Sequence, residues 1–376
     1  MITLKGSKFM SNKYFYFLFI IFFFCQCKKT HDALIGPPLI HKKADELKQT
    51  IVTPSLNIDL DYDKNVIFAA DFQMAWNELV NFNGKPISMD EMTTLVTYLN
   101  NPVIEKRDLD QESIYAAARI ADNETAQNIS DDMEILFNDT PSPELLNCIV
   151  PGYLFAYSYL FCNLSFLHPF ERLKTPLTFK GKKVKCFGFA GYDPKKRKQK
   201  KAAKQVKIYD NDSYGRDDLS KQEKEFVVEI ETIKEKHQLI LARVNPRKTL
   251  VKTIDFALDI MKETEPLGLH EDDRMIIPVF NFKVEKEYPE LCGKTIISEN
   301  PEVNGESFDF AIQITQFRLD DKGAYLKSES LMTVKAIHFN MIFDESFLIM
   351  MKLKESNYPY FAMWVANPEL MAPWDL

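Results

Sequence analysis

The chain has 376 residues, of which 45% are hydrophobic and 12% aromatic. It can therefore bury the core of one large domain or two ordinary ones, and disorder is not expected. The formal net charge is −7 and charges of both signs are mixed along most of the chain, which gives no reason to expect a nucleic-acid partner.

The first thirty residues predict a targeting segment. Tyr14 to Phe24, "YFYFLFIIFFF", form an apolar core of eleven residues, whereas a membrane-spanning helix needs about twenty. A positive region precedes this core and consists of Lys5, Lys8 and Lys13. This order of charge and apolar residues is typical of a secretion signal.

The end of this segment resembles a bacterial lipoprotein signal. Cys25 and Cys27 follow the apolar core directly, and Cys27, which lysines follow, is the preferred site of acylation. Phe24 and Gln26 stand where small residues are usual, so an ordinary cleaved signal peptide is the alternative. We expect an exported protein, anchored as a lipoprotein on the cell surface or in the periplasm and otherwise secreted. Residues 28–44 are expected to be a tether, followed by a single domain over 45–376.

The N-terminal half of that domain is expected to be mainly helical. Asn65 to Phe82 predict a short buried strand leading into a helix, because the later apolar residues recur at helical spacing. The sequence from Ser88 to about Leu146 is polar and favours helix. Its clearest amphipathic pieces are "SMDEMTTLVTYL" and "DQESIYAAARIA".

The C-terminal half is expected to be mainly β. "GYLFAYSYLFCNLSF", residues 152–166, predicts a strand buried on both faces. Further strands are predicted at "PLTFKGKKVKCFGF", "EFVVEIETI", "HQLILARV", "MIIPVFNFKVE" and "SFDFAIQITQFRL", and a final hairpin at "FLIMMKLKE" and "YFAMWVANP". Thr249 to Glu263 interrupt them as a helix. The expected fold class is α+β, with helices of the N-terminal half packed on large, mostly antiparallel sheets.

The sequence carries no strong catalytic or nucleotide-binding motif, so we expect neither an enzyme nor a cofactor. No two histidines have metal-ligand spacing, and each is expected to be a surface or locally bonded residue. These are His31, His41, His168, His237, His270 and His338. The acidic pairs in "LDDKG" and "HEDDR" are expected at strand ends and turns.

The cysteines of the domain do not suggest zinc, because they are far apart and form no CxxC pair. They are Cys148, Cys162, Cys186 and Cys292. One or two disulfides in an exported protein and buried thiols both remain open.

One basic run, "DPKKRKQKKAAK" over residues 193–204, stands out from the mixed charges. We expect a solvated loop there, with contact to an anionic polymer or to lipid headgroups as the functional alternative. The residues that would make that contact are Lys195, Lys196, Arg197 and Lys198.

The C-terminal segments, taken in order, resemble the serpins. Asp321, Lys322 and Gly323 occupy the place of that family's acidic hinge and glycine. "FDESFLIMM" and "YFAMWVANP" take the places of its two terminal strands, and "NVIFAADFQMAW", "NLSFLHPFE" and "LTFKGKKVKCF" resemble earlier family segments. The resemblance spans about residues 45 to 368 and implies an exposed reactive-type loop near the C-terminus.

The resemblance implies a mechanism in which a serine protease cleaves the loop and the loop then inserts as a strand, distorting the bound protease. In an inserted strand alternate residues face inward, so Ala324, Leu326 and Ser328, with Asp321 and Gly323, are the expected hinge residues. This alternation permits insertion. Leu326 and its charged neighbours replace the family's alanine-like run, which is expected to slow insertion. A non-inhibitory serpin-fold surface lipoprotein is therefore the alternative function.

The bond that a protease would cleave has two candidate positions. Counting back from Phe343 favours Lys335–Ala336, which would suit a trypsin-like extracellular protease, whereas counting forward from the hinge favours Ile337.

Overall fold

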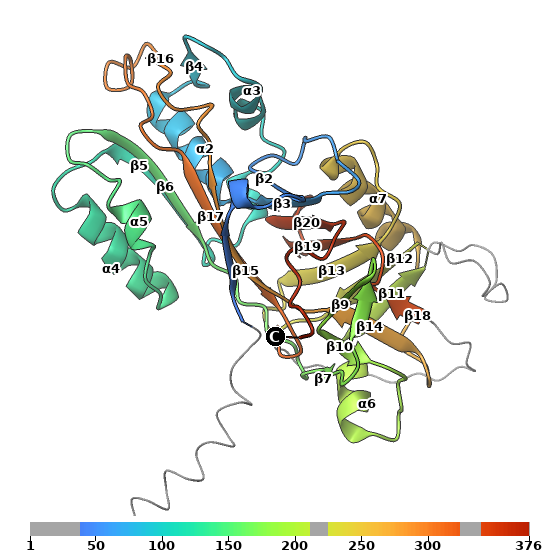
Figure 1. The fold of residues 1–376 in the computed structure, drawn as a ribbon. Coiled ribbons are helices and arrows are strands. Elements are labelled where there is room, and N and C mark those ends of the chain that lie inside the picture. The colour runs from blue at the N-terminus through green and yellow to red at the C-terminus, as the bar shows by residue number, and fades with distance from the viewer. Residues whose placement is uncertain (1–37, 211–224, 324–339, 376) are drawn as a thin grey trace, which may run out of the picture. The chain divides into compact units, whose positions relative to one another are not determined.

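The computed structural model in Figure 1 describes residues 38–210, 225–323 and 340–375. The chain divides into two units, Met1–Pro38 and Leu39–Leu376, and every described element belongs to the second. Within these residues the predicted α+β class is confirmed. No helix in the described ranges is long and apolar enough to cross a membrane.

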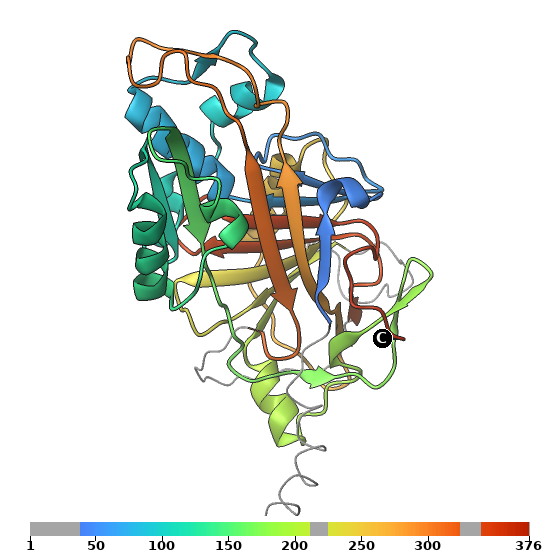
Figure 2. The same cartoon turned by 60° about the vertical axis from the view of Figure 1, so that its left-hand side comes forward.

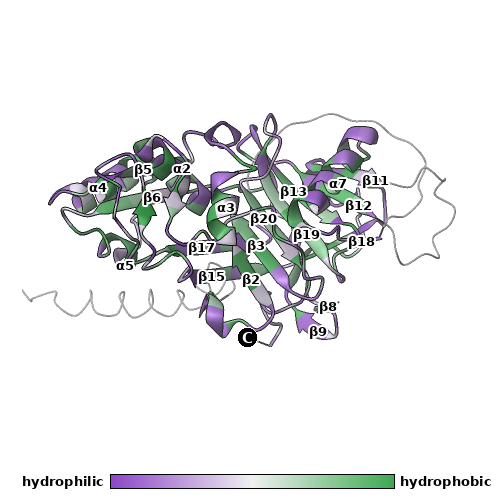
Figure 3. Cartoon of the chain, turned by 90° about the horizontal axis from the view of Figure 1, so that it is seen from above, coloured by the Kyte–Doolittle hydropathy of each residue, from purple (hydrophilic) through white to green (hydrophobic). Residues whose placement is uncertain are grey.

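A seven-stranded sheet forms the centre of the hydrophobic core. Its strands, in spatial order, are β11 (Val206–Asp210), β12 (Phe226–Ile230), β13 (His237–Arg243), β19 (Phe347–Leu353), β20 (Phe361–Val365), β3 (Asn65–Ala69) and β2 (Thr50–Thr53). Neighbours are antiparallel except β2 and β3. Every residue of β3, β12 and β20 is buried, which explains why these strands read as continuous apolar runs, mostly green in Figure 3. The predicted final hairpin, β19–β20, is confirmed.

A four-stranded sheet has the order β18 (Asn340–Ile342), β14 (Arg274–Pro278), β10 (Cys186–Phe189) and β7 (Glu171–Arg172). Gly188 lets β10 approach β14, because a Cβ atom there would lie 2.0 Å from the Met275 carbonyl oxygen and its φ is +126°. Two small pairs accompany the larger sheets: β8 (Leu177–Phe179) with β9 (Lys182–Val184), and β4 (Ser88–Met89) with β16 (Ile296–Ile297).

Two further sheets lie beside each other, as Figure 2 shows. One contains β1 (Ile40–Lys43), β15 (Phe280–Glu287) and β17 (Ile312–Leu319), and the other contains β5 (Ile114–Ile120) and β6 (Leu154–Leu160). Strands β17 and β6 run next to each other in both views of the fold but are not paired.

The helices cover the edges and faces of these sheets. They are α2 (Asp71–Asn83), α3 (Thr94–Asn100), α4 (Thr125–Phe137), α5 (Pro143–Leu146), α6 (Arg197–Ala203) and α7 (Leu250–Glu263), with 3₁₀ turns η1 (Ala44–Glu46) and η2 (Lys106–Asp108). Thr93 and Thr249 cap α3 and α7 through their side chains. The predicted strand and helix over 65–82 and the predicted helix over 249–263 are confirmed. Helix α2 packs on β5 and β6.

Four expectations from the sequence are corrected. "DQESIYAAARIA" is strand β5 rather than a helix, because pairing with β6 outweighs the helix preference of its alanines. Strand β6 is only partly buried along most of its length, not buried on both faces. The basic run contains helix α6, whose Gln199, Ala202 and Ala203 are buried at helical spacing. Residues Ile40–Lys43 of the expected tether form β1, parallel to β15.

Candidate functional site

The turn Asp320–Gly323 follows β17 directly and reverses the chain. The backbone N–H of Gly323 donates to the Asp320 carbonyl oxygen at 3.2 Å, and the Lys322 N–H donates to Asp320 Oδ1 at 3.0 Å. Asp320 is 1% exposed and Asp321 9% exposed. We call this turn the hinge.

Two arginines hold the hinge carboxylates. Arg172 of β7 donates from Nε to Asp321 Oδ1, and its Nη2 lies 3.7 Å from Asp320 Oδ2. Arg318 donates from Nε to Asp320 Oδ2 at 2.8 Å. A buried carboxylate is costly unless it is paired and hydrogen-bonded, so these contacts stabilise the inward position of both acids.

The hinge backbone is also tied to the segment after β6. The N–H of Phe170 donates to the Asp321 carbonyl oxygen at 2.9 Å, and the N–H of Phe166 donates to that of Lys322 at 3.2 Å. The rings of Phe166 and Phe170 are buried and meet edge to face, with centroids 4.9 Å apart. Because a Cβ atom on Gly323 would lie 3.3 Å from the Asp320 carbonyl oxygen, this position favours glycine.

Next to the hinge, two strand edges face each other without pairing. Strand β17 is the outer strand of its sheet, and β6 pairs with β5 alone among the described residues. Asp71 joins the two strands at one point, because Ser158 Oγ of β6 donates to its carbonyl oxygen and Gln313 Nε2 of β17 donates to its Oδ1 at 2.7 Å. We call the space between these two edges the opening.

The charge state of Asp71 is set by its surroundings. Burial raises the pKa of this carboxyl to about 6, and the hydrogen bond from Gln313 opposes that rise. Asp71 is the first residue of α2, where the helix dipole favours a negative charge.

The structure describes only part of the predicted site. Asp321 and Gly323 lie in the turn after β17, whereas Ala324, Leu326 and Ser328 lie outside the described residues. So do the candidate cleavage residues Lys335, Ala336 and Ile337, and the acylation candidate Cys27.

The sequence reading did not anticipate the partners of the hinge. Arg172 is 149 residues from Asp321 in the chain, and no spacing pattern connects them. Arg172 comes directly after the segment "NLSFLHPFE", which resembles a serpin segment. That position is the one signal in the sequence that could have suggested a role for Arg172.

The basic residues that the sequence singled out lie together at the start of α6. Lys195, Lys196, Arg197 and Lys198 are exposed, and Lys195 lies 3.9 Å from Glu271. The buried Gln199 donates from Nε2 to Glu171 Oε2 at 3.1 Å. Strand β7 therefore contacts α6 through Glu171 and the hinge through Arg172. We call the four exposed residues the basic patch.

The four domain cysteines form no disulfide within the described residues. The Sγ atom of Cys162 is within hydrogen-bond distance of two groups. The Tyr360 hydroxyl lies 3.1 Å from it, and His237 Nδ1 lies 3.4 Å from it. His237 is buried, and its Nε2 lies 3.2 Å from Asp110 Oδ2. Burial raises the pKa of the Cys162 thiol and lowers that of His237, which favours the neutral forms of both groups. His237 is thus a locally bonded histidine, as predicted.

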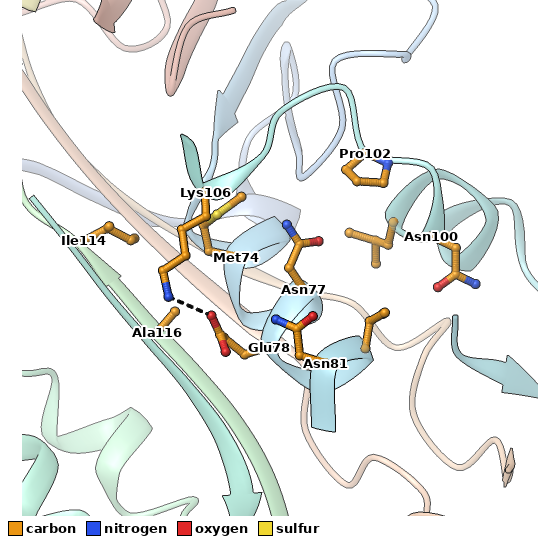
Figure 4. A pocket seen from close by; sticks show the side chains of 11 residues that line it. Met74, Asn77, Glu78, Asn81, Asn100, Pro102, Lys106, Ile114 and Ala116 are labelled. Carbon is orange, nitrogen blue, oxygen red and sulfur yellow. Dashed lines mark hydrogen bonds and ion pairs between the residues drawn. The ribbon is translucent and has the colours of Figure 1, made fainter. Parts of the chain in front are cut away.

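A cavity of about 220 Å³ lies between α2, α3 and β5 (Figure 4). Its lining includes the apolar residues Met74, Leu99 and Ile114. It also includes Lys106 and Glu78, whose Nζ and Oε1 atoms pair at 3.0 Å. Among the described residues no cluster of histidine, cysteine or acidic side chains is arranged to hold a metal ion.

Known proteins resemble the chain in structure rather than in sequence. No family model and no curated protein matches it. Similar solved structures include human thyroxine-binding globulin complexed with thyroxine (10% identity, TM-score 0.43), Serpin48 of the insect Tenebrio molitor (12%, 0.40) and protease nexin-1 with heparin (12%, 0.43). Each alignment covers 81% of this chain and 92% of the other.

The order of the elements agrees with the resemblance to the serpins that the sequence suggests. Strand β3 leads into α2, β17 leads into the hinge, and β19 and β20 form the buried hairpin that follows the loop.

Proposed function

We propose that this protein is an exported inhibitor of an extracellular serine protease that acts by loop cleavage and strand insertion, and that it is not an enzyme. The observation that carries the proposal is the position of the hinge at the end of β17, beside the unpaired edges of β17 and β6. Both edges present backbone groups to the opening, and one added strand would pair with both.

The direction in which the chain turns after β17 supports this proposal. The turn at Asp320–Gly323 already reverses the chain, so a segment that continued along β17 would run antiparallel to it. In a pleated strand, alternate residues after Gly323 would face inward, and Ala324, Leu326 and Ser328 carry no charge.

Incubation of the purified protein with trypsin tests the proposal. We expect a covalent complex that survives denaturing electrophoresis, and we expect Lys335→Ala to abolish it while Lys327→Ala does not. Clean cleavage with continued protease turnover would refute inhibition by trapping. If Lys335→Ala still traps a protease that cleaves after isoleucine, Ile337 is the bait residue.

Thermal stability after cleavage gives a second test. Insertion adds a strand to the core, so the melting temperature should rise sharply when the loop is nicked. An unchanged melting temperature would indicate a passive loop, whether or not a protease was trapped.

A non-inhibitory surface lipoprotein is the second candidate, and the fixed hinge favours it. The bond from Arg172 and two backbone hydrogen bonds must be released before Asp321 and Lys322 can leave their positions. With Leu326 and its charged neighbours, this would slow insertion enough for a protease to complete hydrolysis. A protein that is cleaved by trypsin without a complex and without a rise in melting temperature would have this second function.

We propose that the basic patch binds an anionic polymer. The four side chains are exposed and adjacent, and charge attraction of this kind weakens as salt screens it. We expect elution from a heparin column at lower salt after Lys195, Lys196, Arg197 and Lys198 are changed to glutamine. A matched control changes four other exposed lysines, Lys174, Lys180, Lys182 and Lys183, and should elute like the parent.

We also propose membrane attachment through a lipid on Cys27, consistent with the lipoprotein-like signal. Metabolic labelling with a radioactive fatty acid in a bacterial host should label the parent and Cys25→Ser but not Cys27→Ser. Labelling lost only in Cys25→Ser would move the anchor to that residue, and no labelling would leave a secreted protein.

A further inference from the structure

Four side chains form a hydrogen-bonded cluster beside the end of β6. Cys162 follows β6, His237 begins β13, Tyr360 precedes β20 and Asp110 follows η2. The imidazole of His237 lies between an acid and a thiol, with Asp110 Oδ2 3.2 Å from Nε2 and Cys162 Sγ 3.4 Å from Nδ1. Acid, imidazole and thiol in this order form the arrangement in which a histidine activates a cysteine for nucleophilic attack.

The acid fixes which nitrogen of His237 carries the hydrogen. Burial alone would raise the pKa of Asp110, but hydrogen bonds from His237 and from the Glu112 N–H hold it below its ordinary value, so the carboxyl group is ionised at neutral pH. Burial lowers the pKa of His237, which keeps the ring neutral. Because an ionised carboxylate only accepts, Nε2 donates to it. The lone pair of Nδ1 is then on the side of Cys162, where it can accept a proton.

The thiol proton has two routes to Nδ1. It can pass directly from Sγ, or through the Tyr360 hydroxyl, which lies 3.1 Å from Sγ and 2.9 Å from Nδ1. Tyr360 and His237 are each 2% exposed. Cys162 is only partly buried, and the next residue, Asn163, is exposed. The cysteine thus lies at the edge of the surface, whereas its base is enclosed.

A thiolate at this position would be surrounded by donors. Besides Tyr360 and a protonated His237, the hydroxyl of Ser113 can donate to the sulfur. Lys234 Nζ donates to Ser113 Oγ at 3.3 Å, and its charge favours the thiolate. Burial nevertheless raises the pKa of the Cys162 thiol, so the thiolate is not present beforehand and has to form by proton transfer during a reaction.

Two other cysteines donate to backbone carbonyl groups instead of a base. Cys186 Sγ lies 3.4 Å from the Thr175 carbonyl oxygen, and Cys292 Sγ lies 3.7 Å from that of Tyr288. A backbone carbonyl cannot take up the thiol proton at neutral pH. Cys292 is partly buried like Cys162, whereas Cys186 is 3% exposed. The chain therefore supplies a comparison thiol of similar burial and a second thiol that reports on folding.

We propose that Cys162 is a site of thiol–disulfide exchange with small-molecule disulfides and that His237 is its general base. Sγ attacks one sulfur of the disulfide while its proton passes to His237 Nδ1; a new S–S bond forms to Cys162 and the old S–S bond breaks. The departing sulfur takes the proton from His237 and leaves as a thiol, so that Cys162 remains as a mixed disulfide. Exported proteins meet oxidising surroundings. The inference rests on the proposed export for the supply of disulfide, but not for the reactivity of the thiol.

Reaction of the intact protein with 2-hydroxyethyl disulfide at pH 7.5 tests the proposal, with each cysteine followed by peptide mass spectrometry. We expect Cys162 to form the mixed disulfide about 100-fold faster than Cys292, the lower end of what a positioned base contributes. His237→Gln should remove this advantage, because glutamine can bond to Asp110 but cannot take up the proton. The rate at Cys292 should not change, and the rate at Cys186 should stay low in a folded variant.

Two results would overturn the proposal. One is a Cys162 that reacts no faster than Cys292, and the other is a folded His237→Gln that keeps the parent's rate at Cys162. Because the reaction needs neither a protease nor loop insertion, a protein that fails to inhibit can still pass this test.

Asp110→Asn decides if Cys186 becomes reactive in His237→Gln, which would show that this variant has lost its fold. Asp110 Oδ1 accepts from the Glu112 N–H at 3.4 Å and Oδ2 faces His237. An asparagine that keeps its oxygen on that N–H turns its amide nitrogen toward Nε2, which moves the ring hydrogen to Nδ1. The rate advantage of Cys162 should then be lost, and an unchanged rate would refute the role of His237.

Discussion

The seven-stranded sheet and the region around the opening differ in how their β-strands are paired. In the sheet, neighbouring strands pair in a continuous row and side chains such as Ile349 and Trp364 are 0% exposed. At the opening, β6 and β17 leave facing edges unpaired and β6 is mostly half-buried. The first region forms a continuous buried core, whereas the second leaves backbone groups of two strands without a strand partner on one side.

The two regions also differ in how acid should affect them. His237, on β13 of the large sheet, has a pKa lowered by burial, so protonation opposes the folded state. Asp71, at the opening, has a pKa raised by burial, so protonation favours the folded state. Mild acid should therefore destabilise the folded protein through His237 and stabilise it through Asp71.

The largest expected effect comes from a cavity in the large sheet. Ile349→Ala should lower the free energy of unfolding by about 2–5 kcal/mol, because it removes buried methyl groups from a fully packed site. Leu154→Ala on β6 is the control, and its partly exposed side chain should cost clearly less. Urea denaturation of both variants measures the difference. Equal losses would mean that the two regions are packed alike.

A smaller effect is expected when the hinge is released. Arg172→Ala leaves the carboxylate of Asp321 without its guanidinium partner and should cost about 1–3 kcal/mol. It should also speed loop insertion after cleavage, followed as the rate at which the melting temperature rises. Arg197→Ala, an exposed residue of the basic patch, should change neither quantity. A hinge variant with parent stability and parent rate would show that Arg172 does not restrain the turn.

The opposite pKa shifts of His237 and Asp71 give a third test. Because the folded pKa of His237 is below the unfolded value of about 6.5, the unfolded state binds more protons and stability should fall as the pH drops below 6.5. His237→Gln should flatten this part of the profile, measured by denaturation between pH 5 and 8. Asp71→Asn should do the reverse and steepen the loss, since it removes a group that stabilises the folded state on acidification. Parallel profiles for the two variants would contradict the assignment.

Residue patterns predicted the large sheet better than the opening, for physical reasons. Strands β3, β19 and β20 are buried on both faces, so their apolar runs are visible in the sequence. Strand β5 is an alanine-rich segment whose intrinsic preference is helical, and only its pairing with β6 reveals it as a strand. Asp321 and Gly323 are visible in the sequence as residues of a turn, but the contact of Asp321 with Arg172 depends on the folded arrangement.

The smallest effect is expected at a single hydroxyl on β17. Thr315 is 6% exposed, and its Oγ1 has no hydrogen-bond partner among the described residues. Thr315→Val keeps the shape and removes the unsatisfied oxygen, so it should stabilise the protein by about 1 kcal/mol. Thr315→Ser, which keeps the hydroxyl and loses the methyl group, should destabilise it in the same denaturation experiment. If valine were instead destabilising, the hydroxyl of Thr315 would have a hydrogen-bond partner in solution.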